Sequence, residues 1–418
     1  MRFDRTQVPA AERNTRKKVC MLAYTGYETD NRVRRYAETL VQRGDHVDAI
    51  AYSGRKDLPG VEEVSGVTVH RVQRRTSLER SKLTYAWRLV RFLVVSSFEL
   101  TRLHRRHRYD VIHVHNPPDF LVFAAWYPKL TGAKIILDIH DIVPEMYVSK
   151  FETSRKSLFV KFLKWVERRS IAYSDHVIVS NHLWRDKLIA RSVEEDKCSV
   201  YINHVDPAIF YRRARTRDDG RFVMVFPGAW QWHQGLDIAI EALGHIKDRA
   251  PNAELHLYGG GGGAGMQQRL AEQAKRLGLG ERVKFCGGVP LDSIPEVIAN
   301  ADLGVVPKRA DSFGNEAYST KIMEFMSQGT PAVVSRTKID SYYFKDTDVQ
   351  FFASGDSKAM AEAILAVMEN QELRETLRAN GLQYADRNGW NHKKAEYLEL
   401  VDTLSAPVFD GYRENQKA

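Results

Sequence analysis

Two glutamates eight residues apart, Glu316 and Glu324, form the pattern in the chain that most clearly indicates chemistry. The residues around Glu324 are apolar at positions that cover most of a helical turn, and a glycine and a proline follow as stop signals. A buried carboxylate is costly unless charge-assisted hydrogen bonds replace its water, as ribose hydroxyls or a fixed cation could do. We therefore expect a ligand at Glu324. The residues that predict the helix and its end are Ile322, Met323, Phe325, Met326, Gly329 and Pro331.

The segment between the two glutamates divides the expected ligand into three parts. Glu316 precedes the helix in a loop and would face a sugar. The free amides at the start of the helix, around Ser319 and Thr320, would face a phosphate, and Glu324 would face a ribose. In the alternative reading, Glu324 only pairs with Lys321 three residues earlier and Glu316 is a solvated loop acid.

This run and the strand-like segment 331–335 that follows it resemble the E-x7-E signature of the retaining glycosyltransferases of family 4. The resemblance spans about residues 17 to 400. It implies the GT-B fold class, an α/β architecture of two doubly wound Rossmann-like domains that face each other across a cleft. It also implies a nucleotide-sugar donor (UDP- or GDP-sugar), a saccharide acceptor, retention of the anomeric configuration and front-face attack through an oxocarbenium-like state. Surface-polysaccharide biosynthesis in bacteria is the setting that the resemblance suggests.

The segment 226–235 departs from the family pattern Gly-Arg-Leu-x-x-x-Lys-Gly. Ala229 stands at the arginine position and Gln234 at the lysine position. Two cations that usually neutralise the pyrophosphate are therefore absent, although leaving-group charge still has to be stabilised.

Lys321, at the start of the glutamate helix, is the expected replacement for these cations. His233 or Lys308 would assist it. By the resemblance, the donor is also bordered by Gly228 and Gln234.

Two glycine-rich loops are candidates for contact with the nucleotide. The loop 258–265 follows a predicted strand and precedes a helix, so its unhindered backbone could approach a nucleotide closely. It lacks the Gly-Lys-Ser/Thr of a P-loop, and a flexible turn is an equally favoured alternative. The loop 285–290 resembles the family's loop beside the base, which implies a donor contact at Val289.

In the first half of the chain, His140 follows directly after a predicted strand, where its side chain can reach toward a ligand. The matching histidine of the family lies at the reaction centre, so the resemblance implies that His140 is catalytic together with Glu316. Asp141 would then lie on the acceptor side. A satisfied loop histidine beside Asp141 is the alternative.

The segment 29–35 resembles a subgroup of the family with Asp-x-Arg-Val at the start of the first helix. The resemblance places this helix start on the acceptor side, so Asn31 and Arg32 are predicted acceptor contacts. Alternatively, Asp30 only complements the helix dipole, and Arg32, Arg34 and Arg35 form a solvated face.

Metal ligands do not occur at diagnostic spacing. His113 and His115 alternate on a predicted strand, which is more typical of a structural role, and no convincing Asp-x-Asp loop is present. We therefore expect a metal-independent reaction without a cofactor other than the nucleotide sugar. Cys20, Cys198 and Cys286 lie far apart in apolar stretches, which predicts buried reduced thiols and a cytoplasmic protein.

The charge of the chain is uneven. Residues 1–200 contain 36 Lys and Arg against 24 Asp and Glu, whereas the remainder has a charge of −3, within a total of +9. A basic half attracts phosphates of several kinds, including phosphorylated acceptors and lipid head groups. The segment 82–108 mixes large apolar residues with arginines, so it could lie on an anionic membrane surface, or it could be a core-packed crossover helix. No run is long enough to span a membrane, and no export signal is recognisable.

Alternating short apolar runs and amphipathic stretches predict two series of βαβ units. The predicted domains are 17–207 on the acceptor side and 208–390 on the donor side. A loose arm (1–16) precedes them, a helix over 391–404 packs back on the first domain by resemblance, and a loose tail (405–418) follows. The predicted strands are 19–24, 46–52, 110–115, 133–139, 176–180, 222–227, 253–258, 282–286, 301–306 and 332–335, and the predicted helices include 29–43, 357–380 and 391–404.

The predicted function is thus retaining glycosyl transfer to a lipid-linked or surface polysaccharide acceptor, with possible peripheral attachment to the cytoplasmic face of a membrane. A nucleotide-sugar epimerase of the same architecture is the first alternative. A non-catalytic protein that binds phosphate or nucleic acid is the second, although we expect no nucleic-acid partner. A dinucleotide-dependent oxidoreductase is disfavoured because the first strand is not followed by Gly-x-Gly-x-x-Gly.

Overall fold

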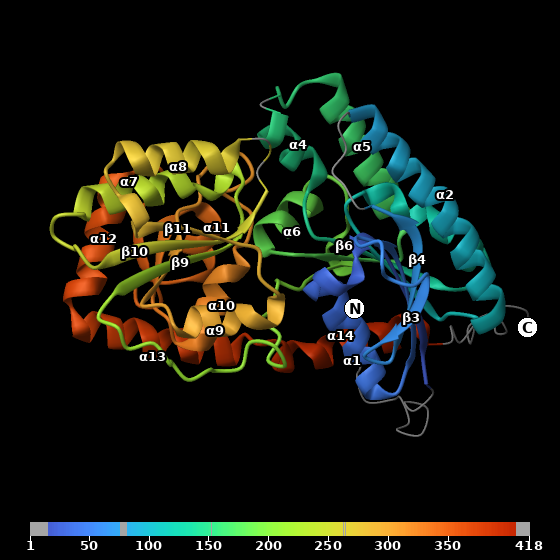
Figure 1. The fold of residues 1–418 in the computed structure, drawn as a ribbon. Helices are drawn as coiled ribbons and strands as arrows, with labels where there is room; N and C mark the ends of the chain where they lie inside the picture. The colour runs from blue at the N-terminus through green and yellow to red at the C-terminus, as the bar shows by residue number, and fades with distance from the viewer. Residues whose placement is uncertain (1–15, 76–81, 152, 262, 264, 407–418) are drawn as a thin grey trace, which may run out of the picture.

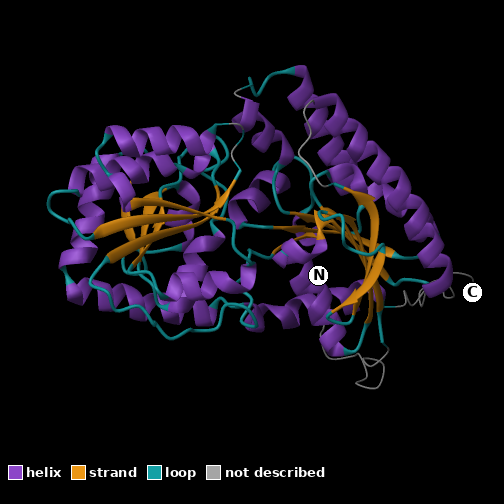
Figure 2. Cartoon of the chain, viewed as in Figure 1, coloured by secondary structure: helices purple, strands orange, loops and turns teal. Residues whose placement is uncertain are grey.

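The computed structural model describes residues 16–75, 82–151, 153–261, 263 and 265–406. The chain forms two α/β domains, each with a twisted sheet between helices (Figures 1 and 2). This arrangement confirms the prediction of two doubly wound domains. The segments expected to form a loose arm and a loose tail lie almost entirely outside the described residues.

The N-terminal sheet has eight strands in the order β3-β4-β2-β1-β5-β6-β7-β8. Its central strands are buried and mostly apolar, as expected of a parallel sheet that is covered on both faces, although β5 and β6 also bury His113, His115 and Asp138. The strands are β1 (Lys18–Gly26), β2 (His46–Ser53), β3 (Val61–Val64), β4 (Val67–Arg74), β5 (Val111–His115), β6 (Lys134–Ile139), β7 (His176–Val179) and β8 (Cys198–Val200).

The C-terminal sheet has six parallel strands in the order β11-β10-β9-β12-β13-β14. As in other open parallel sheets, ligands are expected beyond the carboxyl ends of the strands. The strands are β9 (Phe222–Ala229), β10 (Ala253–Gly260), β11 (Val283–Gly287), β12 (Leu303–Val306), β13 (Ala332–Arg336) and β14 (Gln350–Ala353).

The helices of the N-terminal domain lie in two layers. One hydrophobic cluster joins the sheet to α2, η3, α5 and α6, and another joins its opposite face to α1. Figure 1 shows α2 and α5 on the outer side of the domain. The bounds are α1 (Asn31–Arg43), α2 (Lys82–His107), η3 (Asp119–Ala125), α3 (Trp126–Leu130), α4 (Val143–Phe151), α5 (Leu158–Tyr173) and α6 (His182–Ile189).

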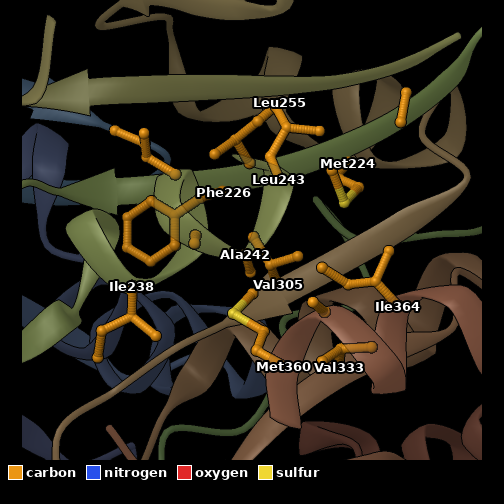
Figure 3. Close-up of a cluster of buried hydrophobic side chains, with 14 of the residues drawn as sticks. Met224, Phe226, Ile238, Ala242, Leu243, Leu255, Val305, Val333, Met360 and Ile364 are labelled. Atoms are coloured by element: carbon orange, nitrogen blue, oxygen red, sulfur yellow. The ribbon is translucent and has the colours of Figure 1, made fainter. Parts of the chain in front are cut away.

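The C-terminal sheet is covered in the same way. The cluster drawn in Figure 3 packs α7, α8 and α12 on one face, and a second cluster packs α9 and α10 on the other. The bounds are α7 (Leu236–Ile246), α8 (Met266–Arg276), α9 (Ile294–Ala299), α10 (Thr320–Gln328), α11 (Lys338–Tyr343), α12 (Ser357–Glu369), α13 (Gln371–Arg387) and α14 (Trp390–Ser405).

The structure differs from the sequence predictions at several places; the strands β8 and β14, for example, were not predicted. The single helix predicted over 357–380 is wrong, because Asn370 is extended and its side chain caps a new helix, α13, at the amide of Leu373. The first helix begins at Asn31 and not at residue 29. The hairpin of β3 and β4 was not predicted, although its turn at residues 65–66 has positive φ angles.

The chain crosses between the domains twice. The first crossing follows β8 at residues 201–206, and the second lies at residues 388–389, before α14. Three side chains of α14 then complete a core cluster of the N-terminal domain: Trp390, Tyr397 and Val401.

Candidate active site

The helix that carries Glu324 forms as its sequence pattern predicts. Extended Ser319 precedes α10, and left-handed Gly329 (φ 72°) ends it. The apolar side chains pack into the core of the C-terminal domain, whereas Glu324 is half-buried at the edge of that packing. Burial raises the pKa of Glu324 to about 7, against the opposing effect of nearby Lys321. A carboxylate so placed gains from a ligand that can donate hydrogen bonds to it.

Lys321 lies on the same helix and turns toward the end of β9. Its Nζ donates to Oε1 of Gln234 at 3.1 Å and lies 4.8 Å from the ring centre of Phe226. Burial lowers the pKa of Lys321 to about 8, against the effect of Glu324. Among the described residues, Lys321 forms no ion pair with Glu324, so the alternative reading of this helix is not borne out.

Gly228 makes room for the Lys321 side chain. Its φ is +143°, and a Cβ at this position would lie 2.6 Å from Cε of Lys321. A side chain here would be strained by the positive φ and would push the flexible end of Lys321 aside, so glycine suits both the backbone and the lysine that crosses it.

The other two candidate cations differ from each other. His233 Nε2 lies 3.0 Å from Nε2 of Gln234, and burial lowers the pKa of His233. Lys308 is buried, donates to the carbonyl of Ala317 at 2.7 Å and pairs with Asp340 at 2.8 Å. The expectation that Lys308 assists at the phosphate is therefore wrong, because its ammonium is used inside the fold.

Glu316 lies where the two domains meet. Its carboxylate pairs with Lys187 of α6, in the N-terminal domain, and its carbonyl accepts from Nδ2 of Asn181 at 3.1 Å. A second lysine, Lys338, is 3.8 Å from the other carboxylate oxygen. Glu316 is thus a bridging residue in this structure and not a solvated acid.

His140 follows β6 and is held by both its backbone and its ring. Its amide donates to Oδ1 of Asn116 at 2.6 Å, and its carbonyl accepts from Oγ of Ser180 at 2.9 Å. Because Asn181 bonds to Glu316, the loop after β7 touches both expected catalytic residues. Sequence reasoning missed Asn116 and Asn181, although each directly follows or nearly follows a predicted strand.

The ring of His140 faces a buried carboxylate. Its Nε2 lies 3.2 Å from Oδ2 of Asp138 and 3.1 Å from Nδ1 of His115. Burial opposes ionisation of Asp138, but Arg32 and the imidazoles hold its pKa well below its usual range. Burial also lowers the pKa values of His113 and His115.

Arg32 does not reach the surface, where an acceptor would contact it. Its side chain is 4% exposed and forms two bonds of 2.7 Å to the oxygens of Asp138. The prediction of an acceptor contact at Arg32 does not fit this burial, and neither does a solvated face that includes Arg35, which is also buried. Asp30 caps α1 by accepting from the amides of Arg32 and Val33, which agrees with the alternative interpretation of Asp30 as a residue that serves the helix start.

Asn31 and Asp141 flank this network. Asn31 Oδ1 is buried and has no partner among the described residues. Asp141 donates its amide to Asn116 Oδ1 at 3.3 Å, and burial raises the pKa of its carboxyl. Their roles toward an acceptor stay predictions.

Two groups of the described residues could geometrically hold a metal. His113, His115 and Asp138 form one, and His46, Asp48 and His107 form the other. In the first group Arg32 already occupies both carboxylate oxygens of Asp138, and in the second Asp48 accepts from Tyr109 and contacts two histidines. Metal independence stays a prediction.

A hollow of about 660 Å³ lies at the glycine loop that was expected to border a nucleotide. Residues 259–261, 263 and 265, the start of α8 and the end of β11 line it, and Phe285 packs edge-on against Trp230 beside it. Half-buried Val289 follows in the next loop. Cys286 in this region is exposed, so the expectation that all three thiols are buried is wrong for this one.

The chain matches two family models. The model of a glycosyl transferase 4-like domain matches residues 29–204, and that of glycosyl transferases group 1 matches residues 208–384. An uncharacterized glycosyltransferase of Methanocaldococcus jannaschii is 27% identical over 72% of this chain and 74% of its own length. A phosphatidyl-myo-inositol mannosyltransferase of Mycobacterium leprae is 23% identical over 71% of this chain and 74% of its own length.

Solved structures share the fold over nearly the whole chain. A sucrose-phosphate synthase of Thermosynechococcus elongatus superposes with a TM-score of 0.76, at 19% identity, and covers 93% of this chain and 99% of its own. Anabaena HepE in complex with UDP and glucose gives a TM-score of 0.72, at 18% identity, with 94% and 100% coverage. The two family models match in order along the two domains, which supports a glycosyltransferase with a glycosyl transferase 4-like N-terminal domain and a group 1 C-terminal domain.

Proposed function

We propose that this glycosyltransferase moves a sugar from a nucleotide-sugar donor to a saccharide acceptor with retention of configuration. One observation carries the assignment of the donor site: Lys321 and Glu324 share one face of α10, do not pair with each other, and have pKa values displaced toward neutrality by burial. A pyrophosphate and a ribose supply the charge and the hydroxyls that these two groups lack. The HepE structure with UDP and glucose supports a donor of this class.

In the proposed reaction, Glu316 orients hydroxyls of the donor sugar and is not a covalent nucleophile. Its present partner Lys187 would give way to those hydroxyls. Lys321 and the free amides at Ser319 and Thr320 stabilise the charge that develops on the leaving pyrophosphate. His140, fixed by Asn116 and Asp138, lies near the anomeric centre on the other side.

The test is a panel of UDP- and GDP-sugars, offered with and without saccharide acceptors. We expect one donor to be consumed only with an acceptor, and the glycosidic proton of the product to show the donor's own anomeric configuration by NMR. Conversion of a donor without any acceptor would favour the epimerase. Salt-sensitive binding of RNA or DNA, with no nucleotide binding, would favour the non-catalytic alternative.

We further propose that the reaction needs no metal ion, because Lys321 supplies the positive charge at the phosphates. Transfer rates should be equal before and after treatment with a chelator. A rate that collapses and returns with added Mg²⁺ or Mn²⁺ would contradict this assignment.

An exposed apolar surface on the N-terminal domain indicates where the acceptor comes from. Large side chains of α2, η3, α3 and α5 are exposed, from 37% for Phe123 to 84% for Leu83. Soluble monomers rarely expose so many large apolar side chains over adjoining helices. We call this surface the apolar face; its members are Leu83, Tyr85, Trp87, Val90, Val94, Phe98, Phe123, Trp126, Leu130, Leu158, Phe159, Phe162 and Trp165.

The charges around the apolar face favour its binding to an anionic lipid bilayer. The acids of α2 and α5 are Glu99, which pairs with Arg102, and Glu167, which is buried and pairs with Arg191. The exposed charges of these two helices are therefore cationic, and aromatic side chains beside cations suit a lipid interface. The exposed cations include Arg91, Arg105, Arg106, Lys156, Lys161, Arg168 and Arg169.

The proposed acceptor is accordingly lipid-linked, at the cytoplasmic face of a membrane, where free cysteines stay reduced. The helix α4 leads from this face to the domain junction: Tyr147 packs on Phe159, and Ser149 bonds to Asp311 of the C-terminal domain at 3.2 Å. No helix among the described residues has the length and apolar character to cross a bilayer.

Sedimentation with lipid vesicles tests the membrane proposal. The protein should bind vesicles that contain phosphatidylglycerol and not those of phosphatidylcholine alone, and high salt should weaken binding. Replacement of Trp87, Phe98 and Trp165 by serine should abolish binding, whereas Tyr211→Ser, an exposed aromatic of the other domain, should not. Equal binding of the triple variant would contradict the proposal.

A further inference from the structure

The first helix carries buried polar side chains toward the places where the chain crosses between domains. Arg32, Arg35 and Thr39 are all buried and follow each other at helical spacing along one side of α1. A buried arginine is costly unless each N–H finds a partner, so the partners of these side chains identify what they are for.

The guanidinium of Arg32 joins two separate structures. Its Nε and Nη2 bind the carboxylate of Asp138, both at 2.7 Å. Its Nη1 donates to the carbonyl of Tyr201 at 2.7 Å and to Oδ1 of Asn203 at 2.9 Å, both in the first crossing. Because the guanidinium is a rigid plane, a shift of the crossing that moves Nη1 also moves the two atoms that hold Asp138.

The two crossings are also bonded to each other. Arg35 donates to the carbonyl of His204, whose ring Nδ1 lies 2.6 Å from the carbonyl of Asn388. Trp390 donates its indole N–H to Thr39 at 2.8 Å and its amide to Val205 at 3.4 Å. A change of angle between the domains must therefore pass through this group of bonds, next to Arg32.

Asp138 continues the connection to the expected reaction centre. Its Oδ2 accepts from Nε of Arg32 and lies 3.2 Å from Nε2 of His140. Only two side chains, Arg32 and Asp138, thus separate the crossing between the domains from His140.

We propose that Arg32 is a positioning residue that ties the orientation of the His140 ring to the angle between the two domains. The ring would reach its working orientation only when the domains hold the donor in place. The role of His140 in transfer rests on the proposed function, but the mechanical connection does not.

Nuclear magnetic resonance of histidine-labelled protein tests the connection without any substrate. Asn203→Ala removes one hydrogen bond between Arg32 and the first crossing, and it removes no atom that contacts Asp138 or His140. We expect it to shift the imidazole signals of His140, which are identified by their loss in His140→Gln. In an Arg32→Gln background the same substitution should leave those signals where they are. The matched control is Arg34→Gln, a half-buried arginine of the same helix that pairs with Glu38 at 3.1 Å.

Kinetics provide the second measurement. Arg32→Gln should lower kcat by about 10- to 100-fold through misorientation of His140, with the donor KM nearly unchanged. Asn203→Ala should lower kcat in the native background and have no further effect in Arg32→Gln. Arg32→Lys should not rescue, because an ammonium cannot bridge Asp138 and the crossing.

The outcomes separate cleanly. His140 signals that ignore Asn203→Ala, or shift equally in both backgrounds, would overturn the proposal. If the wild-type protein transfers no sugar but the signals respond as expected, the proposed function fails and the connection stands. If Arg32→Gln does not fold, Arg32→Lys takes its place as the background, because its ammonium cannot bridge Asp138 and the crossing.

Discussion

Each domain contains a basic and an acidic side chain that lie near each other and are at least partly buried, and burial has a different consequence in the two domains. Arg32 and Asp138 face each other in two short bonds, and further donors surround the carboxylate. Lys321 and Glu324 lie within one helical turn, yet each is left with fewer partners than its charge can use. The first pair is complete without a ligand, and the second is not.

The pKa values reflect this difference. The pKa of Asp138 stays well below its usual range in spite of burial, because Arg32 and two imidazoles compensate the lost water. The pKa values of Lys321 and Glu324 move toward each other, to about 8 and about 7, because nothing compensates fully. A saturated pair holds other groups in place, whereas an incomplete pair marks where a ligand binds.

The largest expected effect comes from breaking the saturated pair. Arg32→Ala leaves the buried carboxylate of Asp138 without its guanidinium partner and should lower the free energy of unfolding by about 3–5 kcal/mol. Denaturation in urea, followed by circular dichroism, measures this. Arg34→Ala on the same helix removes only a surface-type pair and should cost less than about 0.5 kcal/mol. Similar losses for both variants would show that the Arg32–Asp138 pair is not special.

The incomplete pair should respond in binding and not in folding. Glu324→Ala should weaken affinity for the donor nucleotide by about 1.5–3 kcal/mol, the usual worth of hydrogen bonds to a charged group. Its unfolding should change little, because the half-buried carboxylate has no ion-pair partner among the described residues. Titration calorimetry with UDP and GDP measures the affinity, and an unchanged value would remove Glu324 from the site.

The pH dependence of nucleotide affinity sharpens the same comparison. Glu324 binds hydroxyls when ionised, so affinity should rise with pH up to its pKa of about 7. Lys321 binds phosphate when protonated, so affinity should fall as pH rises above about 8. Outside this window the affinity should drop by up to about tenfold per pH unit. In Glu324→Gln the acid limb should vanish, and in Lys321→Arg the alkaline limb; a flat profile in the native protein would contradict both assignments.

The variant with the smallest expected effect distinguishes the role of the start of α1 from that of the Arg32 guanidinium. Asp30→Ala removes the side-chain cap of α1 and should cost about 1 kcal/mol of stability. Because the bonds of Arg32 are kept, the response of the His140 signals to Asn203→Ala should be unchanged in this variant. A lost response would mean that the helix start, and not Arg32, carries the connection.

Most of the fold could be predicted because buried parallel strands correspond to short, mostly apolar stretches of the sequence. Segments such as 19–24 and 222–227, which lie before helical stretches, are most simply interpreted as buried strands. The break at Asn370 was missed because both flanking stretches are strongly helical, and the cap depends on one side-chain bond to Leu373. The β3–β4 hairpin was missed because β3 has only four residues and because β4 buries polar residues, His70, Arg71 and Gln73, that interrupt its apolar pattern.

The geometry of the candidate site could be predicted where it depends on local spacing and not where it depends on distant partners. Lys321 and Glu324 are three residues apart, so a helix places them on one side, and both lie on α10 in the structure. Arg32 is bound to a carboxylate 106 residues away, and Glu316 to a lysine 129 residues away. Sequence periodicity cannot predict contacts between residues so far apart in the chain. The burial of Arg32 and the bridge between Lys187 and Glu316 were therefore found only in the structure.

The return of α14 to the first domain affects how the protein can be made. Trp390, Tyr397 and Val401 fill the same cluster as β1 and α1, and Tyr397 lies 3.0 Å from His113 in the middle of it. During synthesis, the first domain leaves the ribosome long before these side chains do. It must therefore wait, with part of its core open to water, until the whole second domain has been translated, and a fragment cut at residue 207 would never acquire a complete interior.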